Sequence, residues 1–230
     1  MLNNDKDYIL TKYQKQLPAL KKYAQMIYEQ NKIMNITGFK TLEDIFNQGI
    51  LGSLLFFEQT IKNWNLNFEN KKIIDIGSGA GFPSVPFLIA NNNQFNLIII
   101  ESITKRCAFL QTIKEEFNLN ISIINDRAEN VILNLESNFI TARALGSAVS
   151  IYLMSNHLLA KNGCFILPKG KKYKDEVLKF KDKFELESNN ISCYEYYDSI
   201  NNEESSIIKI DKIKPTPRGW PWSWSKIKNY

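Results

Sequence analysis

The sequence predicts an α/β fold: a doubly wound, mostly parallel β-sheet with an antiparallel edge hairpin, preceded by an N-terminal helical region. Apolar residues recur at helical spacing over residues 5–61. From Lys71 onward, short apolar runs alternate with helical stretches, a pattern typical of βαβ units and parallel sheets. We therefore expect a helical region over residues 1–66 that packs on a sheet domain over residues 67–230.

The N-terminal region should contain two amphipathic helices. The first covers residues 5–34 and should be split or restarted at Pro18, because proline has no amide hydrogen to donate. Thr41 with Asp44 is typical of a helix N-terminus, so the second helix should run from there to about Ile61. Residues 63–70 are polar and should connect this region to the first strand.

Five apolar segments should form the parallel strands, each followed by a helix. The expected strands are residues 73–76, 96–101, 121–124, 139–142 and 163–168. The first expected helix ends at about residue 90, and the others cover residues 104–117, about 128–135, 147–160 and 172–184. Residues 191–198 and 205–213 should pair as an antiparallel hairpin at one edge. In such a sheet a ligand binds at the carboxyl ends of the strands, where the strand order reverses.

Composition excludes several classes of protein. With 44% hydrophobic residues the chain can bury a core, and its apolar runs of at most five or six residues are far shorter than the ~18–20 that cross a bilayer. The first residues lack the basic start and apolar run of a secretory signal. Three cysteines without a C-x-x-C pair favour a reducing, cytoplasmic location over a disulfide framework or a metal site.

The positive charge is modest and uneven. The net charge is +5, and residues 161–230 contain 14 basic and 10 acidic residues, which is compatible with an anionic partner such as RNA without requiring one. Only four of the 29 basic residues are arginine: Arg106, Arg127, Arg143 and Arg218. Because a guanidinium group binds carboxylates and phosphates in a geometry that lysine cannot supply, each of the four is a candidate functional residue.

A glycine-rich loop follows the first strand. Gly77, Gly79 and Gly81 lie between this strand and the next helix, where glycine lets a ligand approach the backbone closely. Phe82 stands where a dinucleotide-binding motif would have its third glycine or alanine, which argues against NAD, and the phosphate-binding motif G-x-x-x-x-G-K-[ST] is absent. The alternative is a tight turn that binds no ligand.

Two carboxylates accompany this loop. Asp75 precedes it, and Glu101 lies 20 residues beyond Gly81 at the end of the second strand, where an acidic side chain can accept hydrogen bonds from a ribose diol. S-adenosylmethionine suits such a site, because it has a ribose and an adenine but no pyrophosphate. The loop after the third strand, residues 126–129, would then meet the adenine. The alternative for Arg127 and Glu129 is an ordinary ion pair at the surface.

Arg143 and Lys169 end the fourth and fifth strands, on the acceptor side of this site. The chain has neither a D/N-P-P-Y-like motif for methylation of exocyclic amines nor a Pro-Cys pair for methylation of cytosine C5. Arginine cannot act as a base at neutral pH but can bind a phosphate or a guanine edge, so an acceptor that is already nucleophilic, such as guanine N7, fits this site. For Arg143 the alternative is a salt bridge to Asp75 or Glu101. The lysines around Lys169 could either bind RNA phosphates or lie in a solvated turn.

The C-terminal tail holds three of the four tryptophans. Trp220, Trp222 and Trp224 stand among basic residues, so they could stack on RNA bases or pin the tail onto the domain. His157, the only histidine, should be packed or exposed within a helix rather than catalytic.

Several motifs occur in a fixed order along the chain. Residues 74–86 read IDIGSGAGFPSVP, and residues 101–110 contain ES-x-x-KR-x-x-FL. DRAE at 126–129, ARA at 142–144 and KG at 169–170 follow, and NIT stands at 35–37. In these motifs the chain resembles the bacterial 16S ribosomal RNA guanine-N7 methyltransferases, a family also called glucose-inhibited division protein B. The resemblance covers about residues 25–185.

The resemblance implies a class I S-adenosylmethionine-dependent methyltransferase fold and methyl transfer from S-adenosylmethionine to guanine N7 of 16S ribosomal RNA. It implies that the cofactor contacts Gly77, Phe82, Ala128, Glu129 and Arg143, and that Arg143 and Lys169 also serve the RNA or the target base. The expected cofactor-binding residues also include Asp75, Gly79, Gly81 and Glu101. We expect 16S RNA or the 30S subunit as the partner, no membrane contact and a monomeric protein.

Two departures from the family pattern leave other functions open. The family's R-H-x-x-D-S-like segment reads QGILGS at residues 48–53, so Gly49 and Gly52 replace a histidine and an aspartate. The tail also lacks a clean G-T-P-x-K-x-P-L motif. The alternatives are an RNA-binding or ribosome-assembly module on a degenerate methyltransferase fold, and a methyltransferase for a small molecule or a protein, which the basic rim opposes.

Overall fold

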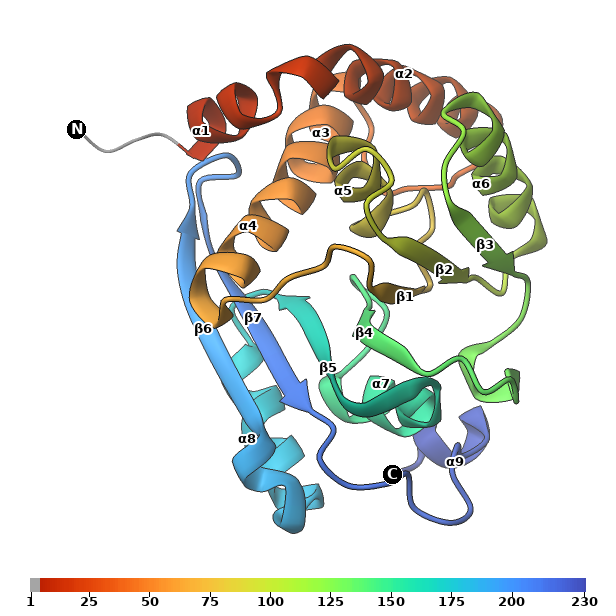
Figure 1. Ribbon diagram of the computed structural model, residues 1–230, viewed down its shortest axis with the longest axis vertical. Coiled ribbons are helices and arrows are strands. Elements are labelled where there is room, and N and C mark those ends of the chain that lie inside the picture. Colours follow the sequence, from red (N-terminus) through yellow and green to blue (C-terminus); the bar gives the residue numbers. More distant parts are fainter. Residues whose placement is uncertain (1–4) are drawn as a thin grey trace.

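A seven-stranded β-sheet forms the centre of the protein, with helices on both of its faces (Figure 1). The computed structural model describes residues 5–230. The strands are β1 (Lys72–Ile76), β2 (Asn96–Ile100), β3 (Ile121–Ile124), β4 (Ser137–Thr141), β5 (Leu159–Lys169), β6 (Ile191–Asp198) and β7 (Glu203–Asp211). Their order is β3-β2-β1-β4-β5-β7-β6, so the order reverses between β1 and β4.

Strand direction follows the expectation from the sequence. β1 to β5 pair in parallel, whereas β7 runs antiparallel to both β5 and β6. The expected mostly parallel sheet with an antiparallel edge hairpin is therefore confirmed. Because β7 is antiparallel to β5, the turn between β6 and β7 lies at the same edge as the carboxyl ends of the parallel strands.

Each face of the sheet has its own hydrophobic core, because neighbouring residues of a strand point to opposite faces. The helices are α1 (Asp5–Lys12), α2 (Leu17–Ile33), α3 (Leu42–Asp44), α4 (Gly52–Trp64), α5 (Ser84–Ala90), α6 (Thr104–Glu116), α7 (Ala148–Ser155), α8 (Tyr173–Lys183) and α9 (Trp224–Lys228). Ile73 of β1 packs with the N-terminal helices, α5 and α6, whereas Ile74 packs with α7, α8 and α9.

The N-terminal helices restart and end close to where the sequence predicts. Pro18 lies in the first turn of α2, and the side chain of Thr41 accepts a hydrogen bond from the amide of Asp44. The second helix is not continuous, however. A π-helix (Ile45–Leu51) lies between α3 and α4, and its wider turn is not visible in the apolar spacing.

Two predicted helices are shorter than expected. Over residues 128–135 only a 3-10 turn forms (Ala128–Asn130); after it Val131 is buried, whereas Ile132 and Leu133 are exposed. The helix predicted over 147–160 ends at Ser155, and His157 lies in the 3-10 turn after it (Asn156–Leu158). β5 begins at Leu159, which pairs with Ser137 of β4, so the strand takes residues assigned to the helix.

Within residues 5–230, no helix is both long and apolar enough to span a membrane. The same residues contain no group of three or more His, Cys, Asp or Glu side chains that could hold a metal ion. The cysteines are free thiols: Cys107 and Cys164 are buried, and Cys193 is exposed.

Candidate active site

The glycine-rich loop connects β1 to α5 at the point where the strand order reverses. Gly77 and Gly79 have φ angles of 65° and 60°, which side chains rarely adopt. A Cβ atom on Gly79 would lie 3.2 Å from the carbonyl oxygen of Ile36, and one on Gly77 would lie 2.7 Å from Cδ1 of Leu145. The loop therefore requires glycine both for its backbone conformation and for close packing.

Glu101 holds this loop in place. Its Oε2 accepts a hydrogen bond from the Gly79 amide at 3.1 Å, and its Oε1 accepts one from the Ile103 amide at 2.9 Å. Nη1 of Arg106 lies 3.8 Å from Oε2, which makes Arg106 a brace of the fold. Each carboxylate oxygen retains a lone pair that a ligand hydroxyl could use.

Asp75 lies beneath the loop rather than in its open side. Its side chain is fully buried, and its Oδ2 accepts a hydrogen bond from the Ser84 amide at 3.2 Å. Its Oδ1 has no hydrogen-bond partner among residues 5–230, and burial raises the pKa of this carboxyl group well above its ordinary value. The structure thus places the predicted carboxylate where it can support the loop from below.

Unpaired buried polar atoms gather around this loop. Besides Oδ1 of Asp75, the hydroxyl groups of Ser78, Ser84 and Thr141 are buried without a partner among residues 5–230. Such groups are rare in folded proteins, and here they cluster at the ligand-binding edge of the sheet. Asp75, Ser84 and Thr141 are fully buried, so these atoms lie in the protein interior rather than on the open side of the loop.

A cavity of about 160 Å³ opens next to the loop, at the carboxyl ends of β1, β2 and β3. Its lining residues are Ile76, Gly77, Ile100, Ser102, Asp126, Arg127, Ala128, Glu129, Leu145, Met154 and Trp224. We refer to it as the donor cavity. The ion pair that the sequence allowed between Arg127 and Glu129 is present, with 3.5 Å between Nε and Oε1.

The tryptophan-rich tail packs against the domain and reaches the donor cavity. The ring of Trp220 meets Tyr152 edge-on, with 5.5 Å between centroids. Trp224 lines the donor cavity, and the guanidinium carbon of Arg127 lies 5.3 Å from the centroid of its ring. Of the two interpretations of the tail, the structure agrees with pinning, and sequence analysis did not connect Trp224 with the donor side.

Arg143 lies on the acceptor side, bound to the π-helix. Its Nη2 donates to the carbonyl oxygen of Gln48 at 3.1 Å, and its Nη1 donates to the Gly49 carbonyl at 3.5 Å and to Ser53 Oγ at 3.4 Å. No carboxylate of residues 5–230 forms an ion pair with Arg143, so the alternative of a salt bridge to Asp75 or Glu101 is wrong. Burial lowers the pKa of the guanidinium group, and the nearby acidic side chains oppose this shift.

Phe82 forms a wall beside Arg143. Its ring is buried, and the guanidinium carbon of Arg143 lies 5.8 Å from the ring centroid. At this distance the aromatic face attracts the cation. The ring of Phe39 lies at a similar distance, 5.7 Å, from the same carbon. Phe82 thus joins the glycine-rich loop to the acceptor side.

Lys169 stabilises the loop after β4. Its Nζ lies 2.8 Å from Oε2 of Glu176 and donates to the carbonyl oxygen of Gly146 at 2.7 Å. Its side chain is only 9% exposed, whereas Lys171 and Lys172 are exposed. Lys169 therefore already has partners in the protein, and the neighbouring lysines lie in an exposed turn.

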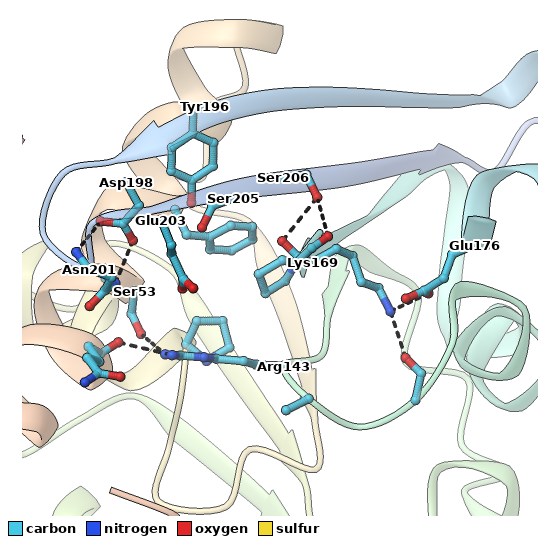
Figure 2. Close-up of a pocket in the computed structure, with 18 residues that line it drawn as sticks. Ser53, Arg143, Lys169, Glu176, Tyr196, Asp198, Asn201, Glu203, Ser205 and Ser206 are labelled. Atoms are coloured by element: carbon cyan, nitrogen blue, oxygen red, sulfur yellow. Dashed lines mark hydrogen bonds and ion pairs between the residues drawn. The ribbon is translucent and has the colours of Figure 1, made fainter. Parts of the chain in front are cut away.

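A second cavity, of about 370 Å³, lies at the ends of β4 and β5 and extends to the β6–β7 hairpin (Figure 2). We refer to it as the acceptor cavity; its volume is in the range of small-molecule sites. Its lining residues include Gln48, Gly52, Ser53, Phe56, Pro83, Arg143, Lys169, Glu176, Tyr196, Asp198, Asn201, Glu203, Ser205 and Ser206. Arg143, Ala144 and Gly146 line the acceptor cavity, whereas Leu145 lines the donor cavity, so one short segment separates the two.

The hairpin wall of the acceptor cavity was not identified from the sequence. The signal was nevertheless present, because an antiparallel strand that follows β5 must begin at the edge where β5 ends. Ser206 pairs with Lys169, and Glu203 pairs with Asp198. The polar residues of the turn are thereby placed at the acceptor cavity.

The fold and the site together are those of a class I S-adenosylmethionine-dependent methyltransferase. The defining features are the glycine-rich loop after β1, the acidic residue at the end of β2 and the hairpin at the edge of the sheet. The family model for rRNA small subunit methyltransferase G matches residues 16–202. The chain belongs to this family.

Curated relatives and solved structures agree with this assignment. The chain is 38% identical over 200 residues to ribosomal RNA small subunit methyltransferase G of Mycoplasma mobile, covering 85% of this chain and 78% of the relative. It is 31% identical over 217 residues to the protein of the same name from Mycoplasmopsis pulmonis, covering 93% and 92%. A putative rRNA methylase from Clostridium thermocellum has a similar fold, with a TM-score of 0.51, 16% identity and coverage of 71% of this chain and 97% of that chain.

The residues around the donor cavity fit S-adenosylmethionine. Gly77 lines the cavity at the start of the glycine-rich loop, and Glu101 at the end of β2 has lone pairs for the hydroxyl groups of a ribose. Apolar side chains of Ile76, Ile100 and Leu145 line the cavity, as an adenine ring requires.

Proposed function

We propose that this chain transfers the methyl group of S-adenosylmethionine to N7 of a guanine in 16S, small-subunit ribosomal RNA. The observation that supports this most directly is that one short segment lines both cavities, Leu145 the donor cavity and Arg143, Ala144 and Gly146 the acceptor cavity. Gly77 of the glycine-rich loop also lines the donor cavity. Family membership supports ribosomal RNA as the substrate.

On the donor side, Gly77, Gly79 and Gly81 would let the cofactor approach the backbone, and Glu101 would accept hydrogen bonds from its ribose. Ala128 and Glu129 would border the adenine, since both line the donor cavity. Asp75 would support the loop from beneath, because its Oδ2 is held by the Ser84 amide. Phe82 and Arg143 would border the methyl group at the junction of the two cavities.

On the acceptor side, Arg143 would orient the base. Its hydrogen bonds to Gln48, Gly49 and Ser53 fix the guanidinium group and leave one Nη2 hydrogen and the Nε hydrogen for the guanine or a phosphate. Lys169 would act by holding the loop that separates the cavities, through its bond to Gly146. Such positioning accelerates a reaction between two bound partners without acid–base chemistry.

When bound, S-adenosylmethionine supplies a methyl group on a positively charged sulfonium. Guanine N7 would accept this methyl group through its own lone pair, and the electron pair of the C–S bond would remain with the departing sulfur. The positive charge would pass to the purine, and no proton would have to be removed. An arginine, which cannot serve as a base at neutral pH, is compatible with such a reaction.

Transfer of labelled methyl groups to 30S subunits that lack the modification tests this function. We expect labelled 7-methylguanosine in the digested 16S RNA, and we expect Arg143→Lys to lose most of the activity because lysine cannot reproduce the planar set of bonds. The absence of 7-methylguanosine with the unmodified protein would contradict the proposal. If calorimetry also detected no S-adenosylmethionine binding, a non-catalytic RNA-binding module would be favoured.

A further inference from the structure

We infer that Glu203, the first residue of β7, binds the Watson–Crick edge of the target guanine and so selects the base. This inference rests on the proposed function and identifies a residue that recognises its substrate. Glu203 lines the acceptor cavity together with Arg143, and in Figure 2 its carboxylate points from the hairpin toward the guanidinium group. The family model ends at residue 202, so Glu203 lies just beyond the matched segment.

The turn before Glu203 is held rigidly. Asp198 is 3% exposed, and its Oδ1 accepts hydrogen bonds from the amides of Ile200 at 2.9 Å and Asn201 at 3.0 Å. Its Oδ2 accepts a further bond from Nδ2 of Asn201 at 2.6 Å. Because Asp198 is also the ladder partner of Glu203, this network fixes the position from which the Glu203 side chain enters the cavity.

Glu203 is the carboxylate of this cavity that remains available for a ligand. Asp198 uses both oxygens within the turn, and Glu176 is bound by Lys169 and by the amide of Ala148, the latter at 2.8 Å. The side-chain carboxylate of Glu203 forms neither a hydrogen bond nor an ion pair with another residue of 5–230, while its backbone belongs to the ladder with Asp198. The Oδ1 atom of Asn201 is also buried without a partner in this part of the chain, so the hairpin wall presents a second unused acceptor.

Arg143 and Glu203 match the two polar edges of guanine. N7 and O6 are acceptors, whereas N1–H and the N2 amino group are donors that a carboxylate can bind with both oxygens. Arg143 can donate to O6 while Glu203 accepts from N1 and N2. Adenine has an acceptor at N1 and an amino group where guanine has O6, so the same arrangement disfavours it.

Glu203 would also favour the reaction itself. Methylation of N7 places a positive charge on the purine, and a carboxylate held against its opposite edge stabilises that charge as it develops. The effect depends on the negative charge, so it distinguishes glutamate from glutamine. We therefore expect a larger effect on kcat than on the KM for the ribosomal substrate.

Glu203→Gln and Glu203→Ala test this role, with Glu204→Gln as the matched control. Glu204 is exposed and points to the other face of the strand, where it lines a separate depression with Tyr173 and Lys174. We expect kcat to fall about 10- to 100-fold in the Glu203 variants, as for loss of a hydrogen-bonded charge, and to remain unchanged in the control. Unchanged S-adenosylmethionine affinity and circular dichroism would show that the variants are folded.

Inosine at the mapped target guanosine gives a readout that a structural role would not produce. Inosine lacks the N2 amino group, so the wild-type protein should methylate it more slowly, while Glu203→Ala should treat guanosine and inosine alike. Wild-type kcat in Glu203→Ala, or the wild-type preference for guanosine in that variant, would overturn the inference. If the wild-type protein forms no 7-methylguanosine at all, the proposed function fails instead.

Discussion

Tyr23 of α2 donates its hydroxyl hydrogen to the backbone carbonyl of Ala80, in the middle of the glycine-rich loop. Both residues are buried, and burial raises the pKa of the Tyr23 hydroxyl well above its ordinary value, so it stays protonated as a donor. A Cβ atom on Gly81 would collide with this hydroxyl group and with Val85. The N-terminal helices are therefore part of the support of the donor site.

Removal of this hydroxyl group should weaken cofactor binding. We expect Tyr23→Phe to raise the Kd for S-adenosylmethionine by about 3- to 10-fold, as for loss of one buried hydrogen bond, in isothermal titration calorimetry. Tyr28→Phe is the control, because it lies on the same helix and its ring contacts Lys32 at the surface. An unchanged Kd in Tyr23→Phe would show that the loop does not depend on α2.

Local rules in the sequence account for the sheet but not for such contacts. The strand, glycine loop and helix over residues 72–90 could be predicted, because apolar runs and glycines act within a few residues. Tyr23 and Ala80 are 57 residues apart, and nothing in the spacing of α2 distinguishes Tyr23 from another core residue. The π-helix and Glu203 were missed for the same reason: their roles depend on the partners that the tertiary fold brings to Arg143.

Trp224 should contribute to cofactor binding from the C-terminal tail. Its indole lines the donor cavity beside Arg127, so loss of the ring opens the cavity to water. We expect Trp224→Ala to weaken S-adenosylmethionine binding about 3- to 10-fold, in line with the energy of one aromatic contact. Trp222→Ala is the control, because Trp222 packs on Tyr230 and Lys226, away from the donor cavity. Equal losses in the two variants would indicate that the tail acts only as a structural unit.

His157 should titrate below its ordinary pKa of 6.5. Burial lowers its pKa, the positive charge of Lys212 adds to this shift, and the bond between Nε2 and the Val131 carbonyl at 2.8 Å opposes it. The folded protein then binds the proton less well than the unfolded chain, so this contribution to stability is complete above pH 6.5 and is lost as the pH falls through the folded-state pKa.

Because His157 is the only histidine, proton NMR can follow its ring signals without assignment of other residues. We expect a titration midpoint below 6.5 in the folded protein. His157→Gln should remove this part of the pH dependence of the free energy of unfolding. A midpoint at or above 6.5 would mean that the ring is more accessible to water than the structure shows.

Glu58 should be important for stability. Its side chain is 8% exposed and accepts hydrogen bonds from Tyr8 at 2.9 Å, Lys12 at 2.6 Å and Tyr13 at 2.5 Å. Glu58→Ala leaves the buried Tyr13 hydroxyl without its acceptor, so we expect the free energy of unfolding in urea to fall by ~2–3 kcal/mol. Glu69→Ala, at an exposed position, should change it by less than ~0.5 kcal/mol.

Gly49 in the π-helix and Gly52 at the start of α4 should respond differently to alanine. A Cβ atom on Gly49 would lie 2.6 Å from Cζ of the buried Phe82 ring, closer than real Cβ contacts, so the ring must move. We expect Gly49→Ala to lower the free energy of unfolding by ~1–3 kcal/mol, as for an overpacked core, and to weaken cofactor binding through Phe82.

At Gly52 the nearest atom to an added Cβ is Nδ2 of Asn201, at 3.2 Å, so this amide group has to move by a few tenths of an ångström within its hydrogen bond to Asp198. Gly52 begins α4, where alanine lowers the conformational entropy of the unfolded chain. Gly52→Ala should therefore unfold within ~0.5 kcal/mol of the wild-type protein. The comparison isolates Phe82, because the ring occupies the space of a side chain at Gly49 but not at Gly52. Equal stability of the two variants would show that the ring moves freely and does not form the wall between the glycine-rich loop and Arg143.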